Sequence, residues 1–343
     1  FFLIEVFSFF LIKNLPITTR PVYKIQERHH YGDYNKSFGA WHLPNTKHIH
    51  KKSCFEVKYS FNSVGARDIE RKLKSQNKNR TIVIGDSVVE GYGVSKDKRI
   101  TNLLERKSNI DHLNFGTSGH YGTTQYYLNY KNLSSFYEHN KLIIFITLAN
   151  DLEDDSYNFG KSYHKNRYRP YLLKNQNEEY EIIYFDKKFF KNSSSIKNEI
   201  KNFLNNYTNF YHILRYLNSA IKSKKIKKNK SEKIKNNINL KNNSTLYFPN
   251  EESIDILKNN IFKISEIAKK KDVIVYLVAI GHKDEFNEYF KSKKIYPTLL
   301  EHLEKISLEN GITFIDAFTN LEIEKKNLGN HFFTCDSHHN IFG

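Results

Sequence analysis

The sequence predicts an α/β fold: a three-layer α/β/α sandwich around a parallel five-stranded sheet, plus an insertion. Short apolar runs rich in β-branched residues alternate with longer segments of helical periodicity, which is typical of strands joined by helical crossovers. The run over residues 80–85 stops at a glycine and is followed at once by an acid and a hydroxyl. In open α/β sheets, such polar residues lie where ligands bind, beyond the carboxyl ends of the strands. Residues 151–250 break the alternation, so we expect them to be the insertion, with a strand at residues 181–185 and a helical stretch over about residues 196–221.

The first expected strand, residues 80–85, contains a β-branched run of the length that is typical of a buried strand. Four further strands are expected at residues 112–115, 142–147, 272–280 and 312–316, and helices at residues 100–106, 123–139, 251–271 and 298–310. Parallel strands require crossovers of this kind, which place helices on both faces of the sheet. We therefore expect a flavodoxin-like sheet.

Residues 1–13 are expected to be the tail of a truncated membrane anchor or signal segment. Residues 1–12 are almost entirely apolar, although a helix that spans a bilayer needs about 20 residues. The alternative is a short buried helix. Residues 14–53 are expected to form an irregular linker, and residues 54–343 to form the domain that carries the insertion.

The formal net charge is +17, and much of the excess lies in residues 221–235, which we expect to be a solvated basic loop. No zinc-finger or RNA-recognition signature occurs, so a nucleic-acid partner is not expected. Cys54 and Cys335 are expected to be buried thiols, with a disulfide as the alternative in an exported protein. No spacing of cysteines or histidines fits a metal site. The histidines of the expected linker are predicted to be surface or loop residues: His29, His30, His42, His48 and His50.

The candidate reactive group is the hydroxyl of Ser87, directly after the first strand. A serine hydroxyl is a good nucleophile where a base can take its proton and a carboxylate holds that base in the right tautomer. Asp336 and His338 supply such a pair, two positions apart near the end of the sequence. The alternative for the first segment is a strand-to-helix turn in which Asp86 or Ser87 only caps a helix.

Four sequence blocks resemble, in the same order, those of the SGNH (GDSL-type) hydrolase superfamily. They are Gly85-Asp86-Ser87 with Gly91 and Gly93, Asn114-Phe115-Gly116-Thr117-Ser118-Gly119, Ala149-Asn150-Asp151, and Asp336-x-His338-x-Asn340-x-x-Gly343. The resemblance covers about residues 54–150 and 270–343. Two departures occur: Leu148 stands where the family usually has glycine, and the family's frequent three-residue spacing between acid and histidine selects His339 as the alternative base.

The resemblance implies a triad of Ser87, His338 and Asp336 that acts through an acyl-enzyme. It also implies an oxyanion hole made by the backbone N–H groups of Ser87 and Gly119 and the side-chain amide of Asn150. No metal or organic cofactor is implied. We expect a serine esterase, with O-acetyl groups of a surface glycan as the first candidate substrate. The alternatives are an O-acyltransferase that modifies cell-surface polysaccharide and a non-catalytic glycan-binding module of the same fold.

The expected partners are a small-molecule or glycan ester and, through the N-terminus, a membrane; the oligomeric state is open. We expect the catalytic domain to be membrane-anchored and extracytoplasmic (periplasmic), with the cytoplasm as the alternative because Lys13 and Arg20 flank the apolar segment. The insertion is expected to overhang the strand ends and to set specificity. Its first acids are expected to be solvated: Asp151, Glu153, Asp154 and Asp155.

Overall fold

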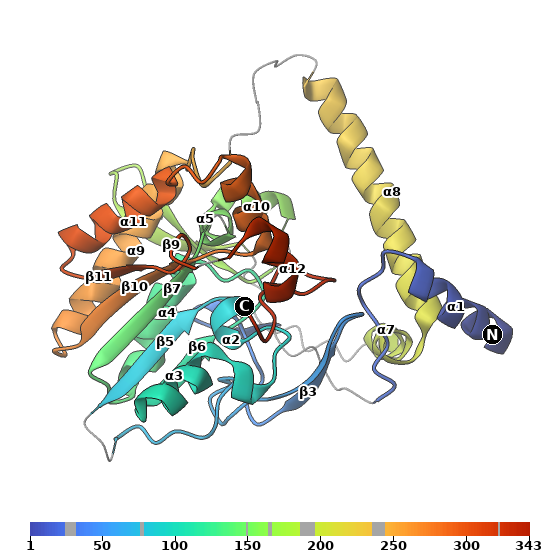
Figure 1. Cartoon of the computed structure of the whole chain (residues 1–343), viewed down its shortest axis with the longest axis horizontal. Coiled ribbons are helices and arrows are strands. Elements are labelled where there is room, and N and C mark those ends of the chain that lie inside the picture. The colour runs from blue at the N-terminus through green and yellow to red at the C-terminus, as the bar shows by residue number, and fades with distance from the viewer. Residues whose placement is uncertain are drawn as a thin grey trace. The chain divides into compact units, whose positions relative to one another are not determined.

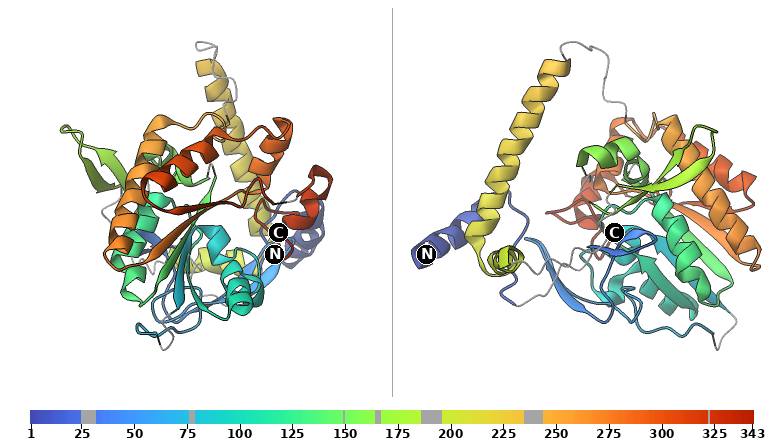
Figure 2. Two further views of the ribbon diagram at one scale, coloured as in Figure 1. Left: turned by 60° about the vertical axis from the view of Figure 1, so that its left-hand side comes forward. Right: turned by 180° about the vertical axis from the view of Figure 1, so that it is seen from behind.

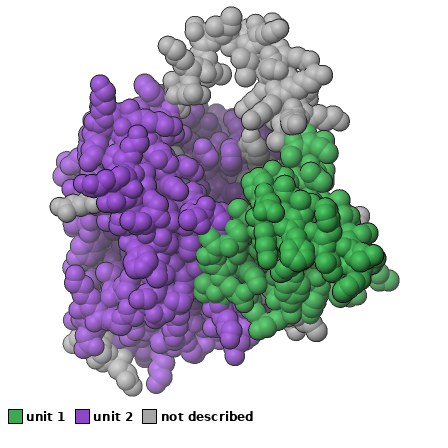
Figure 3. All heavy atoms as spheres, turned by 45° about the vertical axis from the view of Figure 1, so that its right-hand side comes forward, with its two compact units in different colours: residues 1–29, 49–57, 192–243 green, residues 30–48, 58–191, 244–343 purple. Residues whose placement is uncertain are grey.

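The computed structural model describes residues 1–24, 32–75, 79–148, 150–163, 167–185, 196–234, 244–321 and 323–343. The chain forms two compact units, which Figure 3 shows in different colours. Unit 1 comprises residues 1–29, 49–57 and 192–243, and unit 2 comprises residues 30–48, 58–191 and 244–343. The domain boundaries expected from the sequence stay a prediction.

Unit 2 contains a five-stranded sheet (Figure 1). Its strands are β5 (Arg80–Gly85), β6 (Asp111–Gly116), β7 (Lys141–Thr147), β10 (Ile274–Ile280) and β11 (Thr313–Asp316). They lie in the order β11-β10-β7-β5-β6, and every neighbouring pair is parallel. Counted along the chain, this is the 2-1-3-4-5 order of flavodoxin-like folds. The predicted fold class is therefore confirmed.

Helices cover both faces of this sheet (Figures 1 and 2). One face carries α4 (Thr123–Asn132), α9 (Glu251–Lys269) and α11 (Thr298–Glu309), and the other carries α2 (Ser87–Glu90) and α3 (Ile100–Ser108). Successive residues of a strand point to opposite faces, so Ile144 and Phe145 of β7 belong to different clusters.

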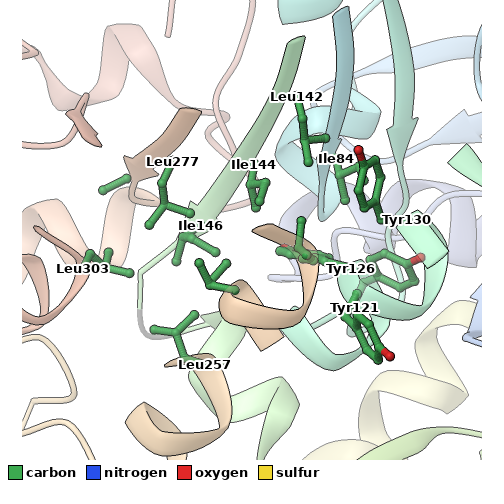
Figure 4. Close-up of a cluster of buried hydrophobic side chains, with 14 of the residues drawn as sticks. Ile84, Tyr121, Tyr126, Tyr130, Leu142, Ile144, Ile146, Leu257, Leu277 and Leu303 are labelled. Atoms are coloured by element: carbon green, nitrogen blue, oxygen red, sulfur yellow. The ribbon is translucent and has the colours of Figure 1, made fainter. Parts of the chain in front are cut away.

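The larger cluster is the main core of unit 2 (Figure 4). In it, Ile144 and Ile146 of β7 pack with Leu257 of α9 and with the ring of Tyr126 from α4. All four side chains are completely shielded from solvent. The aromatic stripe of α4 is therefore part of the core, as its helical spacing suggests.

The predicted helix over residues 123–139 is too long. Helix α4 ends at Asn132, because Leu133 leaves the helical region with φ −142° and ψ −70°. A 3₁₀ turn, η2 (Ser134–Phe136), follows.

The insertion contains the expected strand and helical segment, and one further strand that was not expected. The strand expected at residues 181–185 is β9 (Tyr180–Tyr184), and it pairs antiparallel with an unexpected strand, β8 (Pro170–Lys174). Two helices of unit 1 follow, α7 (Ile196–Tyr207) and α8 (Asn209–Ile234). The prediction of a basic loop over residues 221–235 is wrong as far as Ile234, since lysine is a good helix former.

Part of the expected linker belongs to the core of unit 2. Strand β2 (Gly39–Trp41) is buried along its whole length, and Phe38 before it is fully shielded. The ring of Phe38 packs edge-on against Trp41 at 5.3 Å. These contacts could not be predicted because this segment has no hydrophobic periodicity in the sequence.

In unit 1, the apolar N-terminal segment forms α1 (Phe2–Asn14). Ile12 packs with Ile17 and Ile213, but Phe2 and Phe7 are 77% and 67% exposed. The alternative prediction, a short buried helix, therefore holds only for the side of α1 that carries Ile12, because the side chains of Phe2 and Phe7 are exposed. Within the described part of the chain, no helix is both long and apolar enough to cross a bilayer.

The remaining elements are β1 (Gly32–Asn35), β3 (Lys47–Lys51), β4 (Glu56–Ser60), η1 (Lys96–Lys98), α5 (Asn150–Asp155), α6 (Tyr157–Tyr163), α10 (Lys283–Lys291), η3 (Lys325–Asn327) and α12 (Leu328–His331). Among the described residues, no cysteine is a free thiol, so the preferred expectation of two thiols is wrong.

Candidate active site

Ser87 lies at the carboxyl end of β5, as the first residue of α2. The preceding Asp86 is the N-cap of this helix, and its Oδ1 accepts a hydrogen bond from the Val88 N–H at 2.9 Å. Gly85 permits the sharp turn, because a Cβ there would lie 2.5 Å from the Val89 side chain. The capping role that the sequence left open thus belongs to Asp86, while Ser87 is free to carry out other chemistry.

The C-terminal segment brings His338 to Ser87. His338 Nε2 lies 2.7 Å from Ser87 Oγ, and its Nδ1 makes a very short hydrogen bond with Asp336 Oδ1. The same carboxylate oxygen accepts the His338 backbone N–H at 3.1 Å. The three side chains therefore have the connectivity of a nucleophile, a base and an orienting acid.

His339, the alternative base, points elsewhere. Its Nε2 lies 2.8 Å from the Gly281 carbonyl oxygen. Burial lowers the pKa of His339 to about 4, so this imidazole is neutral at pH 7. Its role in the structure is a hydrogen bond between the C-terminal segment and the end of β10.

Two rings fix the plane of the His338 imidazole. Tyr92 stacks on it with ring centroids 4.0 Å apart and an interplanar angle of 17°. His282 approaches it at 4.6 Å and 59°. Burial holds the pKa of His282 well below its usual range, so this neighbour is neutral and does not repel a proton on His338.

The backbone N–H groups expected to form the oxyanion hole are available. Within the described residues, neither Ser87 N–H nor Gly119 N–H donates a hydrogen bond to the protein. Gly119 has a φ of 107°, a conformation that favours glycine. Both donors can therefore serve a bound ligand.

The Asn150 amide is already engaged. Its Nδ2 donates to Asp86 Oδ2 at 3.2 Å and to Asp154 Oδ2 at 3.3 Å. Ser87 Oγ lies 3.4 Å from the same Asp86 oxygen, so Asn150 and Ser87 share one side of the site. An oxyanion would have to compete with a carboxylate for the Asn150 amide.

The acids at the start of the insertion are not a solvated cluster. Asp151, Asp154 and Asp155 are buried, and only Glu153 is exposed. Asp151 accepts hydrogen bonds from Thr147 N–H and Tyr126 Oη, both at 2.9 Å. The expectation of solvated carboxylates is wrong because Asp151 binds the end of β7, Asp155 accepts the N–H groups of Thr123 and Thr124, and Asp154 pairs with Arg169. Over the ranges that the structure describes, no group of three His, Cys, Asp or Glu side chains is arranged to hold a metal ion.

Three buried polar residues lie near the site, and two of them, Glu90 and His42, were not predicted as site residues. Glu90 lies on α2, one turn after Ser87, and its carboxylate accepts the Ser118 N–H at 2.6 Å. The prediction of surface or loop histidines is wrong for His42 and His50, which are both buried, and His29 and His30 lie outside the described residues. His42 Nε2 lies 3.4 Å from Glu90 Oε1. Arg67 donates to the carbonyl oxygens of Glu90 and Val94, at 2.9 and 2.7 Å. Only the position of Glu90, three residues after the nucleophile, could have suggested its place.

A cavity of about 130 Å³ opens beside Ser87 and His338. Its apolar lining comes from α2, the following turn, α3 and β10: Val88, Tyr92, Val94, Ile100, Leu103 and Ile280. An apolar wall next to a nucleophile suits a ligand with a small uncharged group.

Glu285 gives a testable pH dependence close to the site. Its Oε2 accepts the His282 N–H at 2.9 Å at the start of α10, and burial raises the pKa of Glu285 to about 8. In the unfolded chain, the Glu285 carboxyl ionises near pH 4.5. The folded protein therefore holds this proton more tightly than the unfolded chain, and the wild-type free energy of unfolding falls as the pH rises from about 4.5 to 8. Glu285→Gln keeps an acceptor oxygen but does not ionise. We expect its Tm to exceed that of wild type by about 2–4 °C at pH 8, with the difference shrinking toward pH 4.5.

Thermal unfolding of both proteins between pH 4.5 and 8.5 measures this difference. A Tm difference that does not change over this range would show that Glu285 ionises normally in the folded protein.

Three comparisons with known proteins give different results. No protein-family model matches the sequence, and no curated protein matches it. Eleven chains of solved structures are similar, and two of them are described here. One is a "putative acylhydrolase" from Bacteroides fragilis, with 13% identity over 78% of this chain and 80% of the other, and a TM-score of 0.36. The second is a "GDSL-like lipase" from Bacteroides thetaiotaomicron, with 11% identity over 79% of this chain and 84% of the other, and a TM-score of 0.37. What this chain does is therefore inferred from its own site.

Proposed function

We propose that this protein is a serine esterase in which Ser87 is the nucleophile, His338 the general base and Asp336 the orienting acid. The observation that carries the proposal is the 2.7 Å contact between Ser87 Oγ and His338 Nε2, together with the bond from His338 Nδ1 to Asp336. A nucleophile bonded to a base that is itself oriented by a third group is the arrangement that covalent acyl transfer needs.

In the proposed reaction, Ser87 Oγ attacks the ester carbonyl carbon while its proton passes to His338 Nε2. The tetrahedral intermediate then breaks the bond to the leaving alcohol, which takes the proton from His338. Water attacks the acyl-serine by the same route and restores the Ser87 hydroxyl.

The negative oxygen of the intermediate would accept hydrogen bonds from the N–H groups of Ser87 and Gly119 and from Asn150. Loss of one such donor typically costs about 3 kcal/mol of transition-state stabilisation. Asn150 is the donor that has to reorient, because both hydrogens of its amide are directed at carboxylates.

The substrate we propose first is an O-acetyl ester on a surface glycan. The small apolar cavity beside Ser87 supports a short acyl group, since an apolar cavity of about 150 Å³ holds a molecule the size of benzene. We further propose that the protein is attached to a membrane through its N-terminus, with the catalytic unit on the extracytoplasmic side. The exposed phenylalanines of α1 support the attachment.

The test is the release of p-nitrophenol from p-nitrophenyl acetate, with and without oligosaccharide acceptors. An esterase releases p-nitrophenol and acetate without any acceptor. Release that depends on the acceptor, with acetyl groups appearing on the sugar, would make the protein an O-acyltransferase. No turnover of any ester by folded protein would favour the non-catalytic glycan-binding module.

A further inference from the structure

The carboxylate of Glu90 is completely buried and lies next to the segment that carries Gly119. One of its oxygens, Oε2, accepts two hydrogen bonds from Ser118: one from the backbone N–H at 2.6 Å and a very short one from the hydroxyl. Ser118 directly precedes Gly119, whose N–H is a proposed oxyanion donor. Glu90 is thus bonded to the residue next to that donor.

Glu90 belongs to the same helix as Ser87. Ser87 is the first residue of α2 and Glu90 is the last. The two segments are in close backbone contact, because a Cβ at Gly116 would lie 2.4 Å from the Glu90 nitrogen. The Glu90–Ser118 bonds therefore join α2, which carries Ser87, to residues 116–119, which we call the oxyanion loop because they end at Gly119.

His42 supports the other side of this carboxylate. Its Nδ1 is bonded to the Gly65 carbonyl oxygen at 2.8 Å, and its ring stacks on Phe61 with centroids 4.3 Å apart. Its Nε2 lies 3.1 Å from Thr117 Oγ1 and 3.4 Å from Glu90 Oε1. The imidazole therefore contacts both the oxyanion loop and the acid that binds it.

The carboxylate is ionised although it is buried. Burial alone raises the pKa of Glu90, but the contact with His42, the positive charge of Arg67 and the Ser118 bond outweigh it and bring the pKa down to about 2. An ionised acceptor makes stronger hydrogen bonds than a neutral one. The bonds to Ser118 are therefore of the kind that can hold a loop in one position.

We infer that Glu90 is a positioning residue, whose carboxylate holds the Gly119 N–H at a fixed place relative to Ser87. This inference rests on the proposed function, because it concerns a donor that acts only when an oxyanion forms. A fixed donor stabilises the transition state more than the bound ester, so its displacement lowers kcat more than it changes KM.

The variant Glu90→Gln tests this. The amide is nearly isosteric with the carboxylate but carries no negative charge, so it accepts the two Ser118 hydrogen bonds more weakly. The control is Asp68→Asn, which alters another buried carboxylate of unit 2. Asp68 Oδ2 accepts the Asn114 N–H at 3.2 Å and pairs with Arg71 at 3.1 Å, and it makes no contact with Ser118. Both variants are expected to lose thermal stability.

Two readouts separate positioning from stability. The first is kcat and KM for p-nitrophenyl acetate. The second is the affinity for n-butylboronic acid, whose boron bonds to Ser87 Oγ as the serine proton passes to His338. We expect Glu90→Gln to lower both kcat and boronate affinity by about 10- to 100-fold, with KM within about twofold of wild type. Asp68→Asn is expected to leave kcat and boronate affinity within about twofold of wild type.

If Glu90→Gln does not fold, Ser118→Ala replaces it. This variant removes the hydroxyl bond but keeps the backbone bond, so we expect a loss of about 3- to 10-fold in kcat. Full activity and full boronate affinity in a folded Glu90→Gln or Ser118→Ala variant would overturn the inference. A wild-type protein that neither hydrolyses the ester nor binds the boronate would instead contradict the proposed function.

Discussion

Ser87→Ala is expected to lower kcat for p-nitrophenyl acetate by about 10⁴-fold or more, to near the uncatalysed rate. Without the Ser87 oxygen, no acyl-enzyme forms, and His338 has no hydroxyl to activate. Remaining catalysis would come only from the oxyanion donors and from substrate binding. The measurement is initial-rate kinetics on folded protein.

The matched control for this variant is Ser95→Ala, five residues after the end of α2. The Ser95 hydroxyl is exposed and bonds to Asp97 Oδ1 at 2.6 Å, so its loss should not change kcat more than about twofold. If Ser87→Ala retains a tenth of the wild-type rate, Ser87 is not the nucleophile.

His338→Asn is expected to have the second-largest effect, a loss of about 10³- to 10⁴-fold in kcat. Asparagine can hold the Ser87 hydroxyl but cannot take its proton, so the attack loses its general base. The structure offers a control in the next residue. His339→Asn removes the hydrogen bond to the Gly281 carbonyl oxygen, but it leaves the proposed proton acceptor of Ser87, His338, in place.

We therefore expect His339→Asn to lower thermal stability while kcat stays within about tenfold of wild type. Kinetics of the two variants at one pH, with their Tm values, measure this contrast. A larger loss of kcat in His339→Asn than in His338→Asn would assign the base to His339.

Much of the fold could be predicted from the sequence, because its signals are local. The strand over residues 80–85 has the predicted bounds, and the other four parallel strands lie within two residues of the predicted positions. Alternating strands and helices permit few topologies, since crossovers between parallel strands are almost always right-handed. The residues Ser87, Asp336 and His338 could also be named, because each stands in a short motif with its own chemistry.

The contacts around these residues could not be predicted, because they join segments far apart in the sequence. His42 lies in a segment without hydrophobic periodicity, yet it contacts Glu90. Asp151 stands among other acids, a pattern typical of solvated surface, but Tyr126 and the end of β7 supply its hydrogen bonds. Composition reports the charge of such residues and not the partners that allow their burial.

The same limit applies to Asn150. The sequence block suggests an amide that awaits an oxyanion, whereas the structure engages this amide with Asp86 and Asp154. Burial raises the pKa of Asp86 to about 6, so its charge changes in the range where esterases are commonly assayed. Asp86 and an oxyanion would compete for the Asn150 amide. The outcome depends on residues from separate parts of the sequence, so no single motif encodes it.

The most direct test of the central claim is to identify the residue that reacts with a fluorophosphonate. Serine attacks the phosphorus only when a base activates it, so the modified residue is the activated nucleophile. After incubation of the folded protein and proteolysis, mass spectrometry is expected to find one phosphonyl group, on the peptide that contains Ser87, and none in His338→Asn. A folded wild-type protein that stays unmodified, or that carries the group on another residue, would contradict the account.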